Sequence, residues 1–324
     1  MQYYALVYMS HYLWKKIICH AIIDMAKPEE DKYVVYANDL KYKSLRKIDP
    51  SKAEWYTEDV EQMHETTNCD SLGFRLDESK KNNYQFLDLG GLGLTQIPSF
   101  INYPNYDKLR KIKFLFLNDN KLVDLGDGLK QFDNIEVLDV GKNRLISLNS
   151  LPDNLTELSC HNNKITSIVS HHKLVKIDCS YNNLKTINKH DCLATLICEF
   201  NQLESVNTYP SLKWLTCRHN PLTKINKQLH LKYLDCSYTN LTGHIVNFPS
   251  LVHLMCNGTK VTSLDDGLNL KSLEIAGSLV RELPYYPQLK DLIFKCEDKL
   301  YVPLEYKIKE FHKEHSTGYI EFCT

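Results

Sequence analysis

Residues 174–184 read LVKIDCSYNNL, residues 193–203 read LATLICEFNQL and residues 212–222 read LKWLTCRHNPL. Each segment has apolar residues or cysteine at positions 1, 4, 6 and 11 and an asparagine at position 9. The segments begin 19 residues apart, so the chain repeats at a fixed period. A short fixed period predicts a solenoid, because each copy can bury its apolar side chains only against neighbouring copies.

The same register extends in both directions and gives eleven copies, which we number 1 to 11. They begin at Tyr84, Ile112, Ile135, Leu155, Leu174, Leu193, Leu212, Leu231, Leu251, Leu270 and Leu289. Position 9 is asparagine in copies 2 to 7, and from residue 163 to residue 297 it advances by 19 or 20 residues at every step. Position 9 of the other copies is Leu92, Thr239, Thr259, Ser278 and Glu297. An asparagine there can satisfy backbone groups in the bend after each strand; threonine and serine can do so only in part.

This pattern resembles the leucine-rich-repeat family over about residues 84–300. The short period is most similar to the short-repeat proteins among bacterial secreted effectors, and to those of amoebae and their large DNA viruses. The resemblance implies an α/β-type solenoid, a right-handed coil with a parallel concave β-sheet. Eleven short strands would stack about 4.8 Å apart. Nineteen residues leave too little chain for a full convex helix, so we expect a mostly non-helical convex side.

The apolar column of a solenoid needs a cap at each end. We divide the chain into residues 1–80, a helical cap or small separate domain, residues 81–300, the repeats, and residues 301–324, a C-terminal cap. Ser51 and Glu54 fit the capping box of a helix. Leu304–His315 predicts a second helix, and Tyr319–Phe322 a last strand.

The first 26 residues contain an apolar face formed by Leu13, Ile17 and Ala21 together with a neighbouring row. Lys15 and Lys16 interrupt the apolar run, which excludes a spanning helix and a signal peptide. We interpret this segment as a helix that packs on its own protein; docking on a membrane surface or a partner helix is the alternative.

Composition excludes several classes of protein. Lys and Arg number 39 against 40 Asp and Glu, and this balance disfavours a nucleic-acid binder or a polybasic membrane protein. Eleven cysteines is an odd number, and no secretory leader precedes them, so a disulfide framework is not expected. We therefore expect a cytoplasmic protein, in the host cytoplasm if it is viral or an effector.

Six cysteines share position 6: Cys160, Cys179, Cys198, Cys217, Cys236 and Cys256. Side chains of parallel strands in register point along parallel directions, whereas a disulfide or a tetrahedral zinc site needs them to converge. We interpret the row as core, because Val140 and Ile275 occupy the same position in flanking copies. The chain also lacks the H-E-x-x-H, G-x-S-x-G and C-x-x-C patterns. The sequence thus predicts no enzyme, no metal, no cofactor and no small-molecule substrate.

The remaining candidate surface is the outer face of the sheet, where aromatic residues gather in copies 5 to 8. Trp214 and Tyr233 share position 3 of adjacent copies, so we expect their rings about 4.8 Å apart. Position 8 carries an aromatic or histidine ring in all four copies, and charged residues lie beside these rings. The candidate partner-binding residues are Trp214, Tyr233, Tyr181, Phe200, Tyr238, His219, Arg218, Asp178 and Asp235. The alternative is that the rings only stiffen the sheet.

Three functions follow. The favoured one is a non-catalytic scaffold that binds a protein on the concave face. The second is an adaptor whose residues 1–80 recruit other machinery, such as a ubiquitin ligase, to a target bound by the repeats. The third is an enzyme, since similar bacterial effectors carry a large ubiquitin-ligase domain; the 24 residues after Leu300 leave no room for one.

Overall fold

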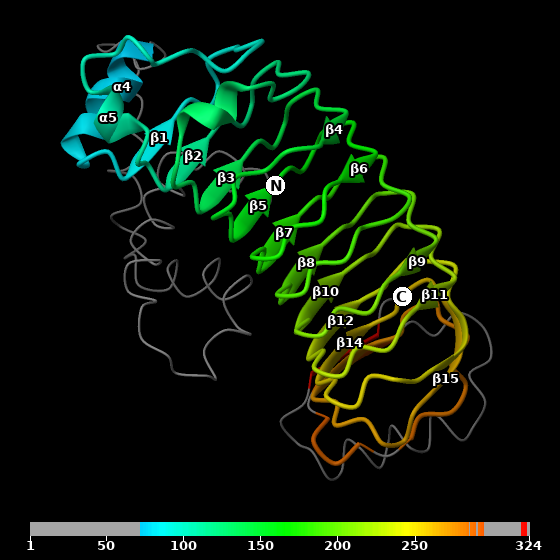
Figure 1. Ribbon diagram of the computed structural model, residues 1–324. Coiled ribbons are helices and arrows are strands. Elements are labelled where there is room, and N and C mark those ends of the chain that lie inside the picture. Colours follow the sequence, from blue (N-terminus) through cyan, green and yellow to red (C-terminus); the bar gives the residue numbers. More distant parts are fainter. Residues whose placement is uncertain (1–71, 285, 290, 295–318, 323–324) are drawn as a thin grey trace, which may run out of the picture. The chain divides into compact units, whose positions relative to one another are not determined.

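The computed structural model describes residues 72–284, 286–289, 291–294 and 319–322. The repeats stack into a coil in which each copy adds one strand to a continuous sheet (Figure 1). The helices predicted after Ser51 and over Leu304–His315, and the apolar face of residues 1–26, lie outside the described residues. The division at residues 80 and 300 stays a prediction.

The main sheet is parallel and keeps strict register from copy to copy. It contains twelve strands, so it confirms the eleven expected strands and the last one at Tyr319–Phe322. In order they are β1 (Phe86–Asp88), β2 (Phe114–Phe116), β3 (Val137–Asp139), β5 (Glu157–Ser159), β7 (Lys176–Asp178), β8 (Thr195–Ile197), β10 (Trp214–Thr216), β12 (Tyr233–Asp235), β14 (His253–Met255), β16 (Ser272–Glu274), β17 (Asp291–Phe294) and β18 (Tyr319–Phe322). We call the sheet face that carries positions 3 and 5 the concave face.

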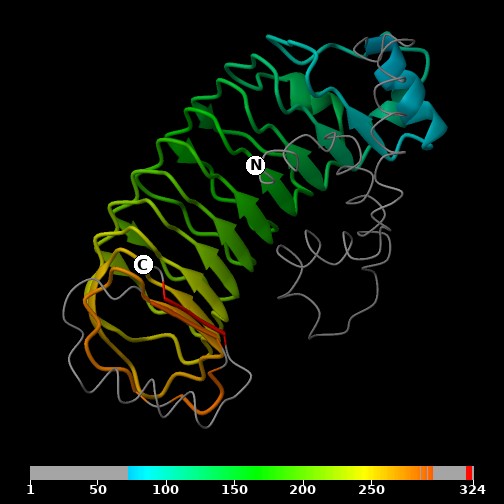
Figure 2. The ribbon, with the colours of Figure 1, turned by 180° about the vertical axis from the view of Figure 1, so that it is seen from behind.

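The opposite side of the coil is mostly extended, as its short period predicts. It carries three two-stranded pairs: β4 (Ser147–Leu148) with β6 (Ser167–Ile168), β9 (Ser205–Val206) with β11 (Lys224–Ile225), and β13 (Thr242–Ile245) with β15 (Lys260–Leu264) (Figure 2). The short helix α5 (Tyr106–Leu109) and the 3₁₀ turn η3 (Gly128–Gln131) fall in copies 1 and 2. These copies are longer than 19 residues and so have chain to spare for a helical turn.

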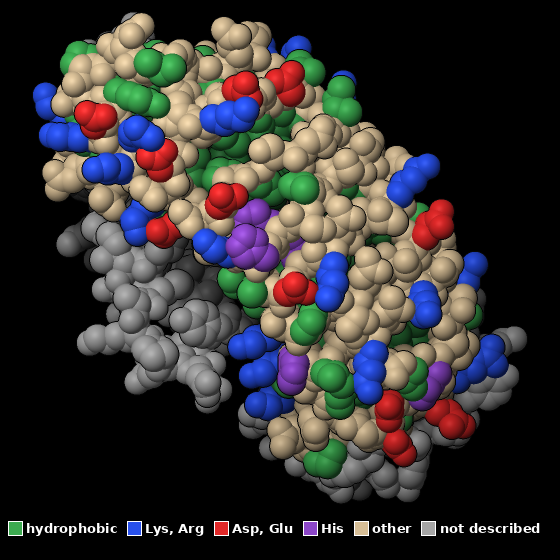
Figure 3. Space-filling model, in the orientation of Figure 1, with side chains coloured by type: hydrophobic (Ala, Val, Ile, Leu, Met, Phe, Trp, Pro, Cys, Tyr) green, Lys and Arg blue, Asp and Glu red, His purple; other side chains and the backbone are tan. Residues whose placement is uncertain are grey.

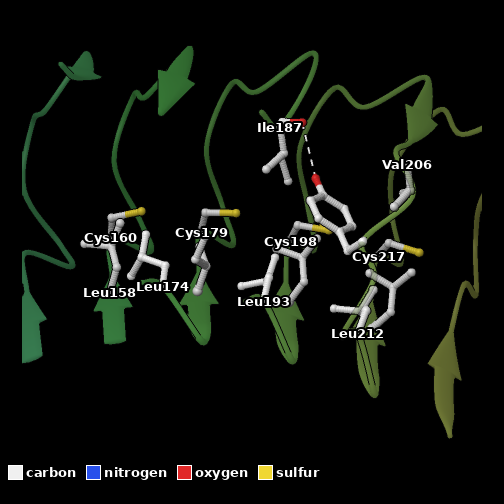
Figure 4. Packing of buried hydrophobic residues seen from close by; sticks show 14 of the residues in the cluster. Leu158, Cys160, Leu174, Cys179, Ile187, Leu193, Cys198, Val206, Leu212 and Cys217 are labelled. Carbon is white, nitrogen blue, oxygen red and sulfur yellow. Dashed lines mark hydrogen bonds between the residues drawn. The ribbon is translucent and has the colours of Figure 1, made fainter. Parts of the chain in front are cut away.

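Positions 1, 4, 6 and 11 point inward and form one continuous apolar core. Figure 4 shows the cysteines of position 6 in a row beside the leucines of positions 1 and 4. At the first copy, helix α4 (Leu72–Lys81) covers the end of this core: Leu76 is buried in it, and Ser79 Oγ donates to Phe86 O at 2.6 Å. No described helix is long and apolar enough to cross a membrane.

The asparagines of position 9 form the expected ladder. Asn182 Nδ2 donates to Cys160 O and Cys179 O, each at 3.0 Å, and its Oδ1 accepts from Ile165 N at 2.9 Å. Each asparagine therefore ties its own copy to the previous one. In the later copies Thr239 Oγ1 and Thr259 Oγ1 each donate to one carbonyl at 2.7 Å, which confirms that threonine replaces only part of the function.

Candidate functional site

The centre of the concave face is a ring pair on neighbouring strands. Trp214 and Tyr233 lie in register on β10 and β12, and their rings stack with centroids 3.6 Å apart and planes 4° apart. On its other side Tyr233 meets the tilted ring of His253 at 6.2 Å. Its side chain is only 8% exposed, and burial raises its pKa well above the usual value. Trp214 is partly exposed and presents this pair to the surface, whereas Tyr233, also a candidate partner-binding residue, is buried.

A second ring stack runs along the bend after the strands. Position 8 contributes Tyr181, Phe200, His219 and Tyr238, which form one column in the sequence order of their copies. Successive centroids are 4.3, 4.2 and 4.7 Å apart, with planes within 15° of parallel. The two outer members, Tyr181 and Tyr238, are 46% and 56% exposed. The structure thus brings together all four position-8 rings that the sequence singles out.

Every residue of this second stack has a left-handed backbone conformation, with a positive φ. Position 8 has a positive φ, between 51° and 75°, in every copy from 1 to 10: Gly91, Asp119, Lys142, Asn162, Tyr181, Phe200, His219, Tyr238, Gly258 and Gly277. A side chain with a Cβ costs about 1–2 kcal/mol there, and glycine, asparagine and aspartate tolerate the conformation best. The sequence reasoning missed this feature. Its signal was available, because most copies outside the ring stack carry those tolerant residues at position 8.

The charged residues between the two stacks take different roles. Arg218 Nε donates to Glu199 Oε2 at 2.7 Å, and both side chains come from position 7. Asp178 Oδ1 accepts from Ser180 N at 3.1 Å and from Ser180 Oγ at 2.8 Å. Asp235 makes the same turn with Ser237 N, but it is only 6% exposed. Asp235 therefore lies below the surface and fixes the turn, so of the three charged candidate residues only Asp178 and Arg218 are partly exposed.

The cysteines of position 6 are buried, and none of the seven described cysteines is in a disulfide. Burial raises the pKa of Cys256 to about 12 and that of Cys217 well above its usual value. Cys217 Sγ lies 3.5 Å from Asp235 O, in hydrogen-bonding range for a weak donor. A buried thiol with a raised pKa is a poor nucleophile, and this geometry fits the core interpretation. Among the described residues no group of His, Cys, Asp and Glu could hold a metal ion.

Two histidines occupy equivalent places on the convex side. His171 Nε2 donates to Pro152 O at 2.9 Å, while His190 Nδ1 lies 3.2 Å from His171 N. Burial lowers the pKa of both imidazoles. Tyr209 and Gln228 fill the same place in the next two copies and also bond to the backbone. The column supports the turns of the convex side, and the repeat pattern did not predict it.

Together, the parallel sheet, the inward leucines and the asparagine ladder define a leucine-rich-repeat coil. No protein-family model and no curated protein match the chain. Solved structures do. YopM from Yersinia enterocolitica WA-314 aligns at 24% identity and a TM-score of 0.51, over 57% of this chain and 47% of its own.

Two further neighbours are leucine-rich-repeat structures. The repeat domain of APL1B aligns at 14% identity and a TM-score of 0.53, over 77% of this chain and 91% of its own. The LRIM1/APL1C complex aligns at 18% identity and a TM-score of 0.51, over 77% of this chain and 54% of that one. The chain spans about half the length of the YopM chain. At these identities the likeness establishes the fold alone.

Proposed function

We propose that this protein is a non-catalytic scaffold that binds a protein partner on the concave face across copies 5 to 8. The observation that carries the proposal is the pair of ring stacks, one centred on Trp214 and one on position 8, with exposed edges on a surface of mixed charge. Exposed aromatic patches are rare on surfaces that bind nothing, and clustered aromatics with arginine are typical of binding hot spots.

The ring stacks also suit binding physically. Rings that already stack on each other have little side-chain entropy left to lose when a partner docks. Arg218, Glu199 and Asp178 border them and would set the orientation of the partner. The neighbour that was solved as an LRIM1/APL1C complex is consistent with a repeat coil engaging another protein. A cytoplasmic location and an adaptor function for residues 1–80 stay predictions.

The charge distribution favours protein over nucleic acid. The net charge of the whole chain is −1, and the face shown in Figure 3 carries acidic as well as basic side chains. A nucleic-acid surface would instead collect cations, because counterion release drives such binding. We therefore assign the ring stacks to a protein partner rather than to stacked bases.

The test is a capture experiment with the full chain and two matched variants. Trp214→Ala removes the exposed ring of the first stack, and truncating such an anchor costs about 2 kcal/mol, or roughly thirtyfold in affinity. Ile146→Ala with Leu229→Ala removes exposed apolar side chains away from the concave face and serves as the control. Partners retained by the wild type and the control but lost by Trp214→Ala support the proposal. Identical partners on all three proteins, at equal melting temperatures, would refute it.

A further inference from the structure

An arginine already lies against the sheet in copy 1. Arg75 extends from α4, with its Nη1 3.4 Å from Asp88 Oδ2 and its Nη2 3.3 Å from Gly90 O. Asp88 occupies position 5, and its other oxygen accepts from Gly90 N at 2.8 Å. One carboxylate oxygen thus fixes the turn while the other faces a guanidinium. The protein itself therefore shows how a position-5 aspartate receives an arginine.

Asp178 repeats this arrangement in copy 5 without the arginine. It also occupies position 5, and its Oδ1 is held by Ser180 as Asp88 Oδ1 is held by Gly90. Asp178 is partly exposed, and its Oδ2 accepts no hydrogen bond from any described residue. Asp235 repeats the turn too, but its side chain is buried. Of these two aspartates, Asp178 alone is partly exposed.

Among the described residues, no ring stacks on the indole of Trp214 on the side toward Asp178. Its neighbour there is Thr195, a short side chain in register on β8. The one described ring that stacks on Trp214 is Tyr233, on the opposite side. The residue in register on the next strand, β7, is Lys176. Its Nζ lies 3.7 Å from Glu157 Oε2, which belongs to the copy farther from Trp214. One indole face above Thr195 is therefore covered neither by a ring nor by a cation of the described chain.

These two features lie within reach of one side chain. Asp178 and Trp214 are on β7 and β10, which are separated by β8 alone, so their strands are about 9.6 Å apart. At positions 3, 5 and 7 of copies 4 to 7, the charged side chains are Glu157, Lys176, Asp178, Glu199 and Arg218. Two ion pairs neutralise four of them and leave the carboxylate of Asp178 in excess. The local field above Thr195 therefore favours a cation.

We infer that the protein partner places an arginine above Thr195, with its guanidinium stacked on Trp214 and its N–H groups donating to Asp178 Oδ2. The inference rests on the proposed function and specifies what the partner must present. A guanidinium is planar and carries donors along its edge, so it stacks and donates at the same time. A lysine ammonium lacks the flat face and cannot do both equally well.

The first experiment supplies the arginine from within the chain. Thr195→Arg puts a guanidinium stem in the middle of the site, and we expect the melting temperature of the full chain to rise by roughly 2 °C. The rise should vanish when Asp178→Asn or Trp214→Ala is added. Thr195→Gln is the neutral polar control and should give no rise. A Thr195→Arg effect that is the same with and without Asp178→Asn would overturn the inference.

The second experiment uses the capped tripeptide acetyl-Gly-Arg-Gly-amide as a probe. We expect it to shift the indole N–H resonance of Trp214 in the full chain, with about tenfold weaker binding in Asp178→Asn. The same peptide with citrulline, the neutral isostere of arginine, should bind no better than that variant. Equal binding of both peptides, or uridine monophosphate shifting the indole more than the arginine peptide, would overturn the inference.

The two proposals fail in different ways. If captured protein partners depend on Trp214 but are indifferent to Asp178→Asn, the binding face stands and the arginine is refuted. If the capture experiment is indifferent to Trp214→Ala, the proposed function falls, whatever the peptide does.

Discussion

Copies 5 to 8 and copies 9 to 10 differ at position 8, where the chain turns out of each strand with a left-handed backbone. Copies 9 and 10 place Gly258 and Gly277 there, which adopt φ values of 62° and 67° without steric cost. Copies 5 to 8 place four rings in the same conformation. The ring column ends against the first glycine: a Cβ at Gly258 would lie 2.7 Å from Tyr238 Cδ1.

This difference distinguishes residues that the turn requires for its backbone conformation from residues that serve the surface. A left-handed residue with a side chain costs about 1–2 kcal/mol, while a ring pair contributes about 0.5–1.5 kcal/mol beyond the area it buries. Over the four residues and three ring pairs of the stack, the pair term offsets only part of the backbone cost, so stacking of the rings on one another does not by itself stabilise the coil. Glycine would serve the turn at least as well. We therefore attribute the rings of the middle copies to binding at the surface rather than to stability of the coil.

The largest expected effect concerns the interior, where the two regions should not differ. Cys217→Asp and Cys256→Asp each bury an unpaired charge and should each cost about 4 kcal/mol or more, enough to unfold much of the coil. Cys217→Val and Cys256→Val nearly conserve volume, as Val140 and Ile275 indicate, and should cost less than about 1.5 kcal/mol. Urea denaturation followed by circular dichroism measures both pairs. A tolerated Cys217→Asp would contradict the core interpretation.

The same interior should be indifferent to metal and redox conditions. We expect the melting temperature to stay unchanged with a chelator or a reductant, because the buried row neither converges nor pairs. The measurement is differential scanning calorimetry of the purified protein in each buffer. One equivalent of zinc in the protein, or a fall of several degrees with reductant, would show that the row has a function beyond packing.

The second effect in size contrasts the asparagine and threonine copies. Asn201 Nδ2 lies within hydrogen-bonding distance of Cys179 O and Cys198 O, and its Oδ1 accepts from Leu184 N. Asn201→Ala leaves these buried backbone groups without hydrogen-bond partners and should lower the free energy of unfolding by about 3 kcal/mol. Thr259→Ala loses only the hydrogen bond to Cys256 O and should lower it by about 1 kcal/mol. Chemical denaturation of both variants tests the ratio. Equal losses would mean that the later copies depend on their ladder as much as the middle ones do.

A smaller effect should appear with pH on the convex side. Burial lowers the folded-state pKa values of His171 and His190 below the usual 6.5. As the pH falls through about 6.5, these histidines bind protons in the unfolded chain but not yet in the folded chain. The free energy of unfolding is therefore at its full value above this pH and declines as the pH falls below it. The urea midpoint measured between about pH 7.5 and pH 5.5 should drop by less in a His171→Gln, His190→Gln variant. Glutamine suits these places because Gln228 already fills the equivalent one in copy 7. An equal drop would assign the loss to other groups.

The interior of this fold could be predicted from the sequence, and much of its surface chemistry could not. Leucine spacing determines which side chains point inward, because an 11-residue pattern repeated in step has only one register that buries all of them. The stacking of Trp214 with Tyr233 followed from the same register. The burial of Tyr233 and Asp235 could not be predicted, because the exposure of a side chain depends on the conformations of its neighbours. The left-handed backbone at position 8 was visible only as a preference for glycine, asparagine and aspartate.

The smallest effect is the most informative about the rings. Phe200→Asn replaces the centre of the position-8 column with the residue that copy 4 has at Asn162, which adopts a φ of 53°. The change loses two stacking contacts, at 4.3 and 4.2 Å, but it relieves the left-handed strain of a bulky side chain. Since these terms oppose each other, we expect the free energy of unfolding to change by less than about 1 kcal/mol.

Leu196→Ala, in the core of the same copy, is the matched control and should cost about 2–5 kcal/mol. Partner capture should fall with Phe200→Asn even though urea denaturation shows a stable coil. A loss of stability approaching that of the core variant would mean that the column holds the copies together. In that case copies 5 to 8 would keep rings for the coil itself, and the contrast with Gly258 and Gly277 would reflect packing rather than recognition.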